Sequence, residues 1–390
     1  MTATLRFVLD QGSVLDSGTA AAHGSAASDA PVPARTADLA VAAVELARGL
    51  VATAPAGCEV ELIVPAGAAA AEPADLVPGV ADTTRLALGR RELAAAWQLG
   101  MPTGVGGGLI HAPSLVAPLV RHDRVHDHDQ TVVTLWDLDA WDHADELPRT
   151  HVMAQRALLK RAVRFADAVV VPTHAAAARV AGIARLGDRL RVISGAPPET
   201  FRVPGDDVGR RRALGLPEGF VLLSGSPGSS SRLGDGLSAV ARAGVDLPVV
   251  VIDAPEGTEP AIAELAAAAG VGEGRVHVRA ALETHDRAAV FGAAVAYVAP
   301  AIGAAFPWRL VEALRLGVPV VVADSDVHRE VVAEGGLIVE PEGEALGEAL
   351  ASALGSTAAA ERLAVLAGDR GRAFSWAGAA ERVWQLHADL

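Results

Sequence analysis

The sequence has almost no cysteine, few aromatic residues and no long uninterrupted hydrophobic run. Cys58 is the only cysteine among the 390 residues, which excludes an intramolecular disulfide and a metal centre built from several cysteines. No segment approaches about 18 consecutive apolar residues, so the sequence predicts no transmembrane helix. The opening MTATLRFVLD has too short an apolar run for a signal peptide, and we expect a cytoplasmic protein.

Positive charge is also scarce. The chain has 33 Lys and Arg residues against 47 Asp and Glu residues, giving a formal net charge of -14. An acidic chain repels a phosphate backbone, so we expect no nucleic-acid partner. Aromatic residues make up only 4% of a chain that is 51% hydrophobic, so Ala, Val and Leu must form its cores. This composition favours parallel sheets covered by helices.

The length and the hydrophobic pattern indicate two α/β domains. Short apolar runs alternate with helical patterns, as is typical of βαβ units. The segment at 194–207, SGAPPETFRVPGDD, interrupts the pattern with three prolines and two glycines and is predicted to be the interdomain linker. The expected strands before it are LRFVLD, EVELIVP, GLIHAP, TVVTLWDL, AVVVP and RLRVIS. The expected strands after it are GFVLLSG, VDLPVVVID, RVHVRA, AVAYVAP, VPVVVAD and GLIVEP.

One segment resembles a known family. Residues 299–341 read APAIGAAFPWRLVEALRLGVPVVVADSDVHREVVAEGGLIVEP, with a strand, a loop, a helix bearing a glutamate, Gly-x-Pro-Val, an Asp and then Arg-Glu. This segment resembles the retaining GT-B glycosyltransferases of family four, the glycosyl transferases group 1. Weaker similarity extends from about residue 108 to the closing FSWAGAAERVWQLHADL, whose apolar spacing predicts an amphipathic helix.

The resemblance implies an α/β fold of the GT-B type, with two facing Rossmann-like domains, parallel sheets and a C-terminal crossover helix. It divides the chain into an acceptor domain over 1–200, a nucleotide-sugar donor domain over 201–373 and a helix over 374–390 that packs back toward the N-domain. Nucleotide diphosphates bind outside the carboxyl ends of parallel strands, where helix N-termini offer free N–H groups. The implied reaction moves a hexose from a nucleoside diphosphate sugar to a glycan or glycolipid acceptor with retention, without a cofactor.

Two positions of the characteristic segment bear on the donor. Glu312 matches the family glutamate that hydrogen-bonds the ribose hydroxyls; the alternative is a solvated helix glutamate. Eight positions earlier the family's second glutamate is replaced by Ala304. The following turn supplies Phe306 and Arg309 as donor-site residues, and either Arg309 or Trp308 is the candidate to replace the lost sugar contact. Packing between helices is the alternative role for Trp308.

The loop SGSPGSSSRLGDGL is the predicted diphosphate site. The family carries an Arg-Lys pair where this sequence has Ser230 and Ser231, which can donate hydrogen bonds but supply no charge to the departing diphosphate. Arg232 is one residue further along. A flexible Gly/Ser surface loop is the alternative interpretation. The predicted donor contacts in this loop are Gly225, Ser226, Gly228, Ser230, Ser231 and Arg232.

In the N-terminal half, the family's usual His-Asp pair is replaced by Trp136 and Asp137. Asp137 is the predicted catalytic residue, because Asp139, Asp142 and His143 gather with it at the carboxyl end of a strand, where functional groups concentrate. A solvated loop is the alternative.

Two further patterns suggest ligands less strongly. The stretch HDRVHDHDQ at 122–130 places only two His or Asp ligands on each face, so no metal site is predicted. The helix with Arg156, Lys160, Arg161 and Arg164 suggests a weak contact with an anionic membrane surface, and a solvated basic face is the alternative.

At three places this sequence lacks the polar catalytic groups of the family that it resembles, which suggests a second class of function. The altered places are Ala304, the pair Ser230 and Ser231, and Trp136. A catalytically silent relative that binds a partner glycosyltransferase or a ligand is therefore the alternative to an active transferase. A GT-B epimerase or phosphorylase is a third interpretation.

Overall fold

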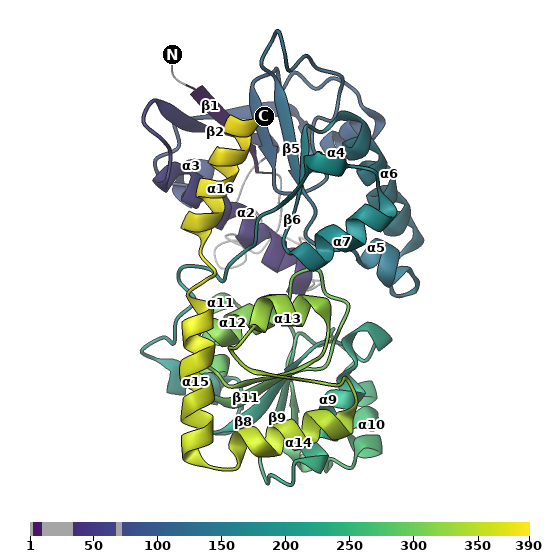
Figure 1. The fold of residues 1–390 in the computed structure, drawn as a ribbon, viewed down its shortest axis with the longest axis vertical. Coiled ribbons are helices and arrows are strands. Elements are labelled where there is room, and N and C mark those ends of the chain that lie inside the picture. The colour runs from purple at the N-terminus through teal and green to yellow at the C-terminus, as the bar shows by residue number, and fades with distance from the viewer. Residues whose placement is uncertain (1–2, 10–33, 68–71) are drawn as a thin grey trace. The chain divides into compact units, whose positions relative to one another are not determined.

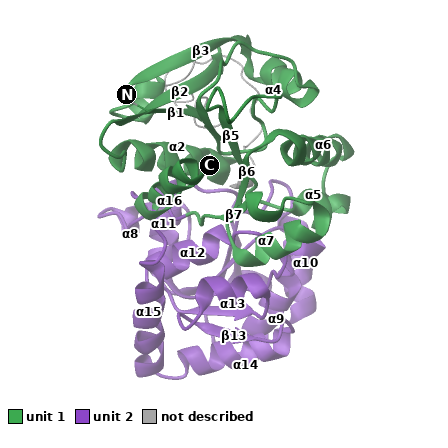
Figure 2. Cartoon of the chain, turned by 45° about the horizontal axis from the view of Figure 1, so that its top comes forward, with its two compact units in different colours: residues 1–29, 35–195, 376–390 green, residues 30–34, 196–375 purple. Residues whose placement is uncertain are grey.

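The computed structural model in Figure 1 describes residues 3–9, 34–67 and 72–390. These residues form two compact units, coloured separately in Figure 2. Of the described residues, unit 1 contains 3–9, those from Arg35 to Gly195 and those from Trp376 to Leu390, and unit 2 contains Ala34 and Ala196–Ser375. The first change of unit lies inside the segment predicted as the linker, and the second lies immediately before the last helix.

Unit 1 is built on a parallel sheet with the strand order β3-β2-β1-β4-β5-β6-β7. Leu5 at its centre pairs with Val60 on one side and Leu109 on the other. All residues of β5 and β6 are buried, as expected for a parallel sheet covered on both faces. The strands are β1 (Ala3–Val8), β2 (Cys58–Ala66), β3 (Asp82–Gly89), β4 (Leu109–Ala112), β5 (Gln130–Thr134), β6 (Ala168–Val171) and β7 (Leu190–Val192).

The helices of unit 1 have local start and stop signals. Thr173 begins α7, where its hydroxyl accepts a hydrogen bond from the Ala176 N–H at 3.0 Å. Gly100 ends α4 in the left-handed conformation that glycine adopts without strain. The helices are α2 (Ala34–Ala52), α3 (Pro73–Leu76), α4 (Arg90–Leu99), α5 (Asp139–Asp142), α6 (Arg149–Phe165), α7 (His174–Ile183) and α16 (Trp376–Asp389).

The six strands predicted before the linker are confirmed, but the sequence did not reveal β3 or α4. In β3, Leu86 is the only buried residue, because the strand lies at the edge of the sheet. An edge strand with mostly polar, half-exposed residues lacks the continuous apolar run by which the buried strands were recognised.

Unit 2 repeats the architecture with the parallel strand order β10-β9-β8-β11-β12-β13. All six predicted strands are confirmed, and with them the α/β class with two parallel sheets. The central strands β8, β9 and β12 consist almost entirely of buried Val, Leu, Ile and Ala. The strands are β8 (Phe220–Ser224), β9 (Val249–Ile252), β10 (Val276–Val278), β11 (Ala294–Ala299), β12 (Val320–Ala323) and β13 (Leu337–Val339).

Small residues let the helices of unit 2 pack closely. A Cβ at Gly343 would lie 2.7 Å from the Ser238 Cβ, and one at Gly347 would lie 2.9 Å from the Arg242 Cβ, so α14 needs glycine to approach α9. The helices are α8 (Asp207–Ala213), α9 (Leu233–Arg242), α10 (Glu259–Ala269), α11 (Thr284–Ala293), α12 (Trp308–Arg315), α13 (Asp326–Val332), α14 (Gly343–Leu354) and α15 (Thr357–Gly371). Within the described ranges, no helix is both long and apolar enough to cross a bilayer.

The last helix, α16, completes unit 1. The Trp384 indole N–H donates to the Leu50 carbonyl at 3.1 Å, which joins α16 to α2. The Trp376 ring stacks edge-on against Trp136, with 6.2 Å between centroids. Gly49 of α2 allows this approach, because a Cβ there would lie only 2.8 Å from the Trp376 carbonyl oxygen. Figure 1 shows α16 running beside α2 and the sheet.

We expect Gly49→Ala to lower the free energy of unfolding by about 1 to 3 kcal/mol, because the added methyl forces the backbone of α16 away. Gly182→Ala in α7 is the matched control, since that glycine has open space around it. There, alanine should leave stability unchanged or raise it by about 0.4 to 1 kcal/mol. Urea unfolding measures both. Equal behaviour of the two variants would contradict the close contact of α2 with α16.

Candidate functional site

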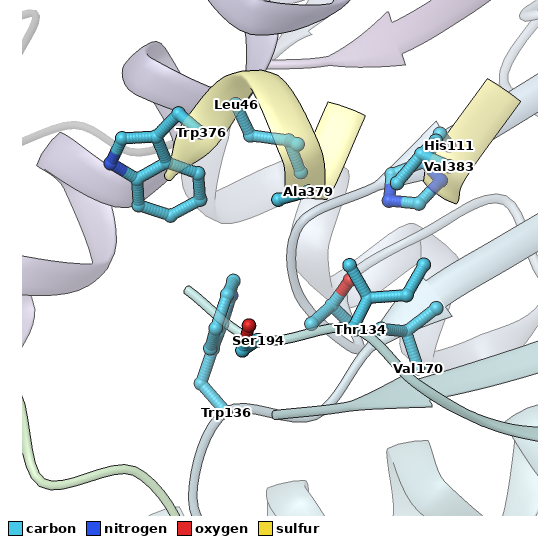
Figure 3. A pocket seen from close by; sticks show the side chains of 10 residues that line it. Leu46, His111, Thr134, Trp136, Val170, Ser194, Trp376, Ala379 and Val383 are labelled. Atoms are coloured by element: carbon cyan, nitrogen blue, oxygen red, sulfur yellow. The ribbon is translucent and has the colours of Figure 1, made fainter. Parts of the chain in front are cut away.

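The carboxyl ends of the unit 1 strands border a small cavity. It is lined by side chains from the ends of β4 to β7, together with residues of α2 and α16 (Figure 3). About 10 Å³ of the cavity is open to the centre of a water molecule, which is close to the space that one water needs. His111, Thr134 and Trp376 line it, and the His111 Nε2, Thr134 Oγ1 and Trp376 Nε1 atoms are buried with no hydrogen-bond partner among the described residues. A bound water would satisfy polar groups in this wall.

His111 belongs to a buried chain of three polar side chains. Its Nδ1 lies 3.4 Å from the His387 Nε2, and the His387 Nδ1 lies 2.9 Å from the Gln130 Oε1. Burial, and then the proximity of His387, hold the pKa of His111 well below its ordinary value. Burial lowers the pKa of His387 to about 4. Both rings are therefore neutral near pH 7 and act there as hydrogen-bonding groups rather than as cations.

Trp136 fills the position of the histidine expected from the resemblance. Its indole is 6% exposed and donates to the Pro113 carbonyl at 3.0 Å. The neighbouring Asp137 is half-buried, and its Oδ1 accepts a hydrogen bond from the Asp139 N–H at 3.2 Å, at the start of α5. Asp142 instead pairs with Arg179. The loop thus brings Asp137 and Asp139 together, and the catalytic role of Asp137 stays a prediction.

The contacts of the basic helix α6 and the surroundings of the histidine-rich stretch bear on the two weaker patterns of the sequence. Two of the four cations of α6 form hydrogen bonds within the protein: the Nε of the exposed Arg156 donates to the Ala140 carbonyl at 3.0 Å, and the half-buried Arg161 donates to the Leu119 carbonyl. The solvated basic face and the weak membrane contact of α6 both stay predictions. In the described part of the chain, no three His, Cys, Asp or Glu side chains come together as metal ligands.

In unit 2, the loop after β8 closes on itself through its serine hydroxyls. The Ser231 Oγ accepts from the Ser226 N–H at 3.1 Å, and the Ser226 Oγ accepts from the Gly228 N–H at 3.3 Å. Gly225 has a φ of 134°, and a Cβ there would lie 2.8 Å from the Ser231 Oγ, so this position requires glycine. Ser230 lies in the same turn, half-buried. The loop thus holds its shape through its own hydrogen bonds, and its role as the diphosphate site stays a prediction.

Arg232 leaves this turn in the left-handed conformation, with a φ of 48°. Its Nη2 donates to the Pro341 carbonyl at 2.8 Å and lies 3.0 Å from the Asp235 Oδ2. The side chain remains 28% exposed at the N-terminus of α9. Arg232 is thus held at the carboxyl-end edge of the sheet, where its charge is partly balanced by Asp235.

Glu312 lies in a buried network of ion pairs. Its carboxylate accepts from the Arg287 Nη2 at 2.8 Å and from the Arg309 Nη1 at 3.2 Å. The Arg309 Nε in turn donates to the Asp253 Oδ2 at 2.6 Å. Glu312 is 2% exposed, so the interpretation as a solvated helix glutamate is wrong. A ribose hydroxyl would compete with two guanidinium groups for the same oxygens, and the ribose role stays a prediction.

The network is neutral overall, with two arginines balancing two carboxylates, and it occupies the carboxyl ends of β9 and β11. Asp253 follows β9 directly with a φ of 63°, an uncommon conformation for a residue other than glycine. Close to the network, the Tyr297 hydroxyl lies 2.7 Å from the Ser224 Oγ, and burial raises the pKa of Tyr297. Arg287 and Asp253 were not among the site residues predicted from the sequence. The place of Asp253 at the end of a buried strand was the one signal available.

The remaining predicted donor residues lie around the start of α12. Phe306 is buried, with its ring edge-on to Trp308 at 4.6 Å and to Phe374 at 6.4 Å between centroids. Trp308 therefore takes part in aromatic packing. Arg309 is engaged in the ion network, and Ala304 is half-buried in the loop after β11. The predicted donor residues of unit 2 thus form two separate groups. One is the serine loop with Arg232, and the other is the start of α12 with Glu312.

The comparisons with known proteins agree on the architecture. Residues 236–366 match the family model described as Glycosyl transferases group 1. No curated protein matches the chain. Among solved structures, sucrose-phosphate synthase from Thermosynechococcus elongatus is similar with a TM-score of 0.65 at 19% identity, over 99% of this chain and 98% of that one.

Two further structures are similar over the full chain. Anabaena HepE in complex with UDP and glucose has a TM-score of 0.66 at 17% identity, over 100% of both chains. A glycosyltransferase from Rickettsia africae has a TM-score of 0.62 at 13% identity, over 100% of this chain and 98% of that one. At these identities the likeness concerns the fold, and the two parallel-sheet units have the GT-B architecture predicted from the sequence.

We expect Glu312→Ala to lower the free energy of unfolding by about 3 to 5 kcal/mol, because it leaves two buried guanidinium groups without their shared partner. Glu348→Ala, at an exposed position of α14, removes the same type of side chain and should change stability by at most about 0.5 kcal/mol. Guanidinium chloride unfolding measures the difference. If the two variants were equally stable, Glu312 would not be anchored in the network.

The lowered pKa of His387 predicts a specific loss of stability in acid. In the unfolded chain His387 binds a proton near the ordinary pKa of 6.5, and in the folded chain only near 4. The free energy of unfolding therefore falls as the pH is lowered from 6.5 to 4, and it does not depend on His387 above this range. His387→Gln should reduce this slope by up to about 1.4 kcal/mol per pH unit. Urea unfolding at several values between pH 7 and pH 5 measures it. His122, whose pKa is raised, contributes equally to both proteins, so identical slopes would disprove the burial of a neutral His387.

Proposed function

We propose that this chain is a glycosyltransferase that moves a hexose from a nucleoside diphosphate sugar to a glycan or glycolipid acceptor with retention of configuration, in the cytoplasm. The observation that carries the proposal is the match of residues 236–366 to the Glycosyl transferases group 1 model. That stretch begins inside α9, next to the serine loop, and contains Glu312. The proposed reaction uses no metal or other cofactor. The complexes of Anabaena HepE with UDP and with UDP-glucose support UDP-sugars as the first donors to test.

The proposed donor site is the carboxyl-end edge of the unit 2 sheet. The turn from Gly225 to Ser231 and the N-terminus of α9 provide backbone N–H groups and a positive partial charge for a diphosphate. Arg232 adds one partly exposed cation. Arg309 is 8% exposed in its side chain and already pairs with two carboxylates, so it adds little charge for a ligand. Because serines replace the Arg-Lys pair of the family and Asp235 partly balances Arg232, we expect weak donor affinity and slow turnover.

The proposed acceptor unit is unit 1, with Asp137 as the polar group nearest to the chemistry. A retaining transfer needs a polar group that orients the acceptor hydroxyl, or receives its proton, beside the sugar carbon. The half-buried Asp137, fixed by the Asp139 N–H, has the required chemistry. The indole of Trp136, which donates to the Pro113 carbonyl, cannot exchange protons in this way.

A second candidate function is a catalytically silent glycosyltransferase relative that binds a ligand or a partner glycosyltransferase. The specific observation in its favour is that the groups expected to meet the donor are already occupied. The Ser231 hydroxyl holds its own loop, and the Glu312 carboxylate is held by Arg287 and Arg309. Such internal pairing stabilises these loops without any ligand.

Donor binding is tested by titrating the purified chain with UDP-glucose, GDP-mannose and ADP-glucose in a calorimeter. We expect one of them to bind, and Arg232→Gln to weaken that binding by about tenfold or more through loss of a charge-assisted contact. Arg242→Gln makes the same change of charge at the exposed opposite end of α9 and is the control. Its affinity should equal that of the wild type.

The same samples distinguish the two candidate functions. Hydrolysis or transfer of the bound donor sugar, followed by release of UDP, supports the transferase. Binding without turnover over a range of acceptors supports the silent relative. If no nucleotide or nucleotide sugar binds at millimolar concentration, the proposed donor site is wrong.

A further inference from the structure

Unit 1 has a basic pocket at the opposite edge of its sheet from the cavity of Figure 3. It is an open hollow of about 570 Å³, and its lining includes four arginines and a histidine, namely Arg121, His122, Arg124, Arg164 and Arg189. Its size is that of a pocket for a small ligand. A concentration of positive charge of this kind is unexpected in a chain with a net charge of -14. We refer to these five residues as the basic pocket.

The position of the basic pocket separates it from the proposed transfer chemistry. Asp167, at its base, comes directly before β6, and its N–H donates to the carbonyl of Thr131 near the start of β5. Arg189 comes directly before β7. The pocket therefore lies at the amino ends of the strands, whereas donors and acceptors of parallel α/β folds bind at the carboxyl ends. Its occupant is independent of the proposed function.

The single carboxylate in the wall of the basic pocket is neutralised within it. The Asp167 Oδ2 accepts from the Thr131 N–H and lies 2.7 Å from the His122 Nε2. The His122 Nδ1 lies 3.0 Å from the Val120 carbonyl oxygen, so both ring nitrogens face acceptors and the ring is best satisfied as a cation. This pairing with Asp167 raises the pKa of His122. The pocket consequently keeps an excess of positive charge.

Arg189 and Arg164 contact other groups of the protein through their guanidinium groups. The Arg189 Nη1 and Nη2 donate to carbonyls at the end of α6, those of Ala166 at 2.8 Å and Val163 at 2.9 Å. The Arg164 guanidinium lies over the Phe165 ring, 5.1 Å from its centroid. These contacts fix one wall of the pocket.

Arg121 and Arg124 are exposed, and across the described ranges neither forms an ion pair or a hydrogen bond through its side chain. Asp123 interacts electrostatically with Arg121, and Asp167 with Arg124, but these carboxylates are already paired with His126 and His122. The cations around the hollow outnumber the carboxylates, so they repel one another, and a bound anion relieves this repulsion. The guanidinium group matches the oxygens of phosphate bidentately, and several guanidinium groups around one hollow suit a group that carries more than one negative charge.

We propose that the basic pocket is a binding site for a phosphate group, either of a soluble phosphate or diphosphate ester or of a phospholipid headgroup. Arg189 and Arg164 form its fixed wall, and Arg121 with Arg124 closes on the phosphate oxygens. The net negative charge of the chain does not attract an anion from a distance, so binding depends on these short-range contacts. Salt screens the contacts, so the affinity falls as the salt concentration rises.

The test uses the full chain and the double variant Arg121→Gln with Arg124→Gln. Both side chains are exposed, so the variant is expected to fold normally, which its thermal unfolding verifies. The control is Arg91→Gln with Arg185→Gln, which removes the same charge from exposed positions of the same unit. The probes are inorganic pyrophosphate, followed by calorimetry, and phosphatidylcholine vesicles with or without phosphatidylglycerol, followed by flotation.

We expect wild type and control to bind one of the two probes equally, and the pocket variant to bind it about tenfold more weakly or worse. Loss confined to pyrophosphate identifies a soluble phosphate ligand, and loss confined to phosphatidylglycerol vesicles identifies a lipid headgroup. The proposal is overturned if the wild type binds neither probe, or if the pocket and control variants lose binding to the same extent.

Discussion

The buried ion network of unit 2 is the constraint on which its candidate site depends. Arg287 on α11, Glu312 and Arg309 on α12, and Asp253 after β9 hold three segments together at the carboxyl ends of the strands. Charges taken out of water are tolerated only while all of them are paired, so each group fixes the positions of the others. The start of α12 is therefore held by the pairing of Arg309 with both carboxylates. Any donor that uses Glu312 must share its carboxylate with guanidinium groups, which couples ligand binding to the integrity of the core.

Much of the fold could be predicted from the sequence, because buried parallel strands are continuous apolar runs. The strands β8, β9, β11 and β12 are recognisable for this reason, and so is α16, whose apolar spacing follows the helical period. The edge strand β3 was not predicted, because a single buried leucine does not make a hydrophobic pattern. Its pairing with β2 is decided by the backbone and by cross-strand contacts, which a local window of sequence does not contain.

The candidate site was less predictable, because its chemistry lies in pairings between distant residues. A local motif located Glu312, but its partner Arg287 is 25 residues earlier and has no motif of its own. In the same way, the sequence showed the serines that replace an Arg-Lys pair, but not that Ser231 would hold the turn by accepting the Ser226 N–H. Residue type indicated which groups were available, and only the three-dimensional arrangement showed which of them were already engaged.

The place of α16 has a consequence for the order in which the chain folds. Almost all of the described part of unit 2 is one continuous segment, from Ala196 to Ser375, whereas unit 1 gains its last helix only when residues 376–390 have been made. The hydrogen bond from Trp384 to Leu50 joins residues 334 positions apart. During synthesis, the surface of α2 and the face of Trp136 that contact α16 therefore stay exposed until unit 2 has been made. Contacts of such long range form late, so the surfaces awaiting α16 are those at which a nascent or truncated chain is most exposed to aggregation.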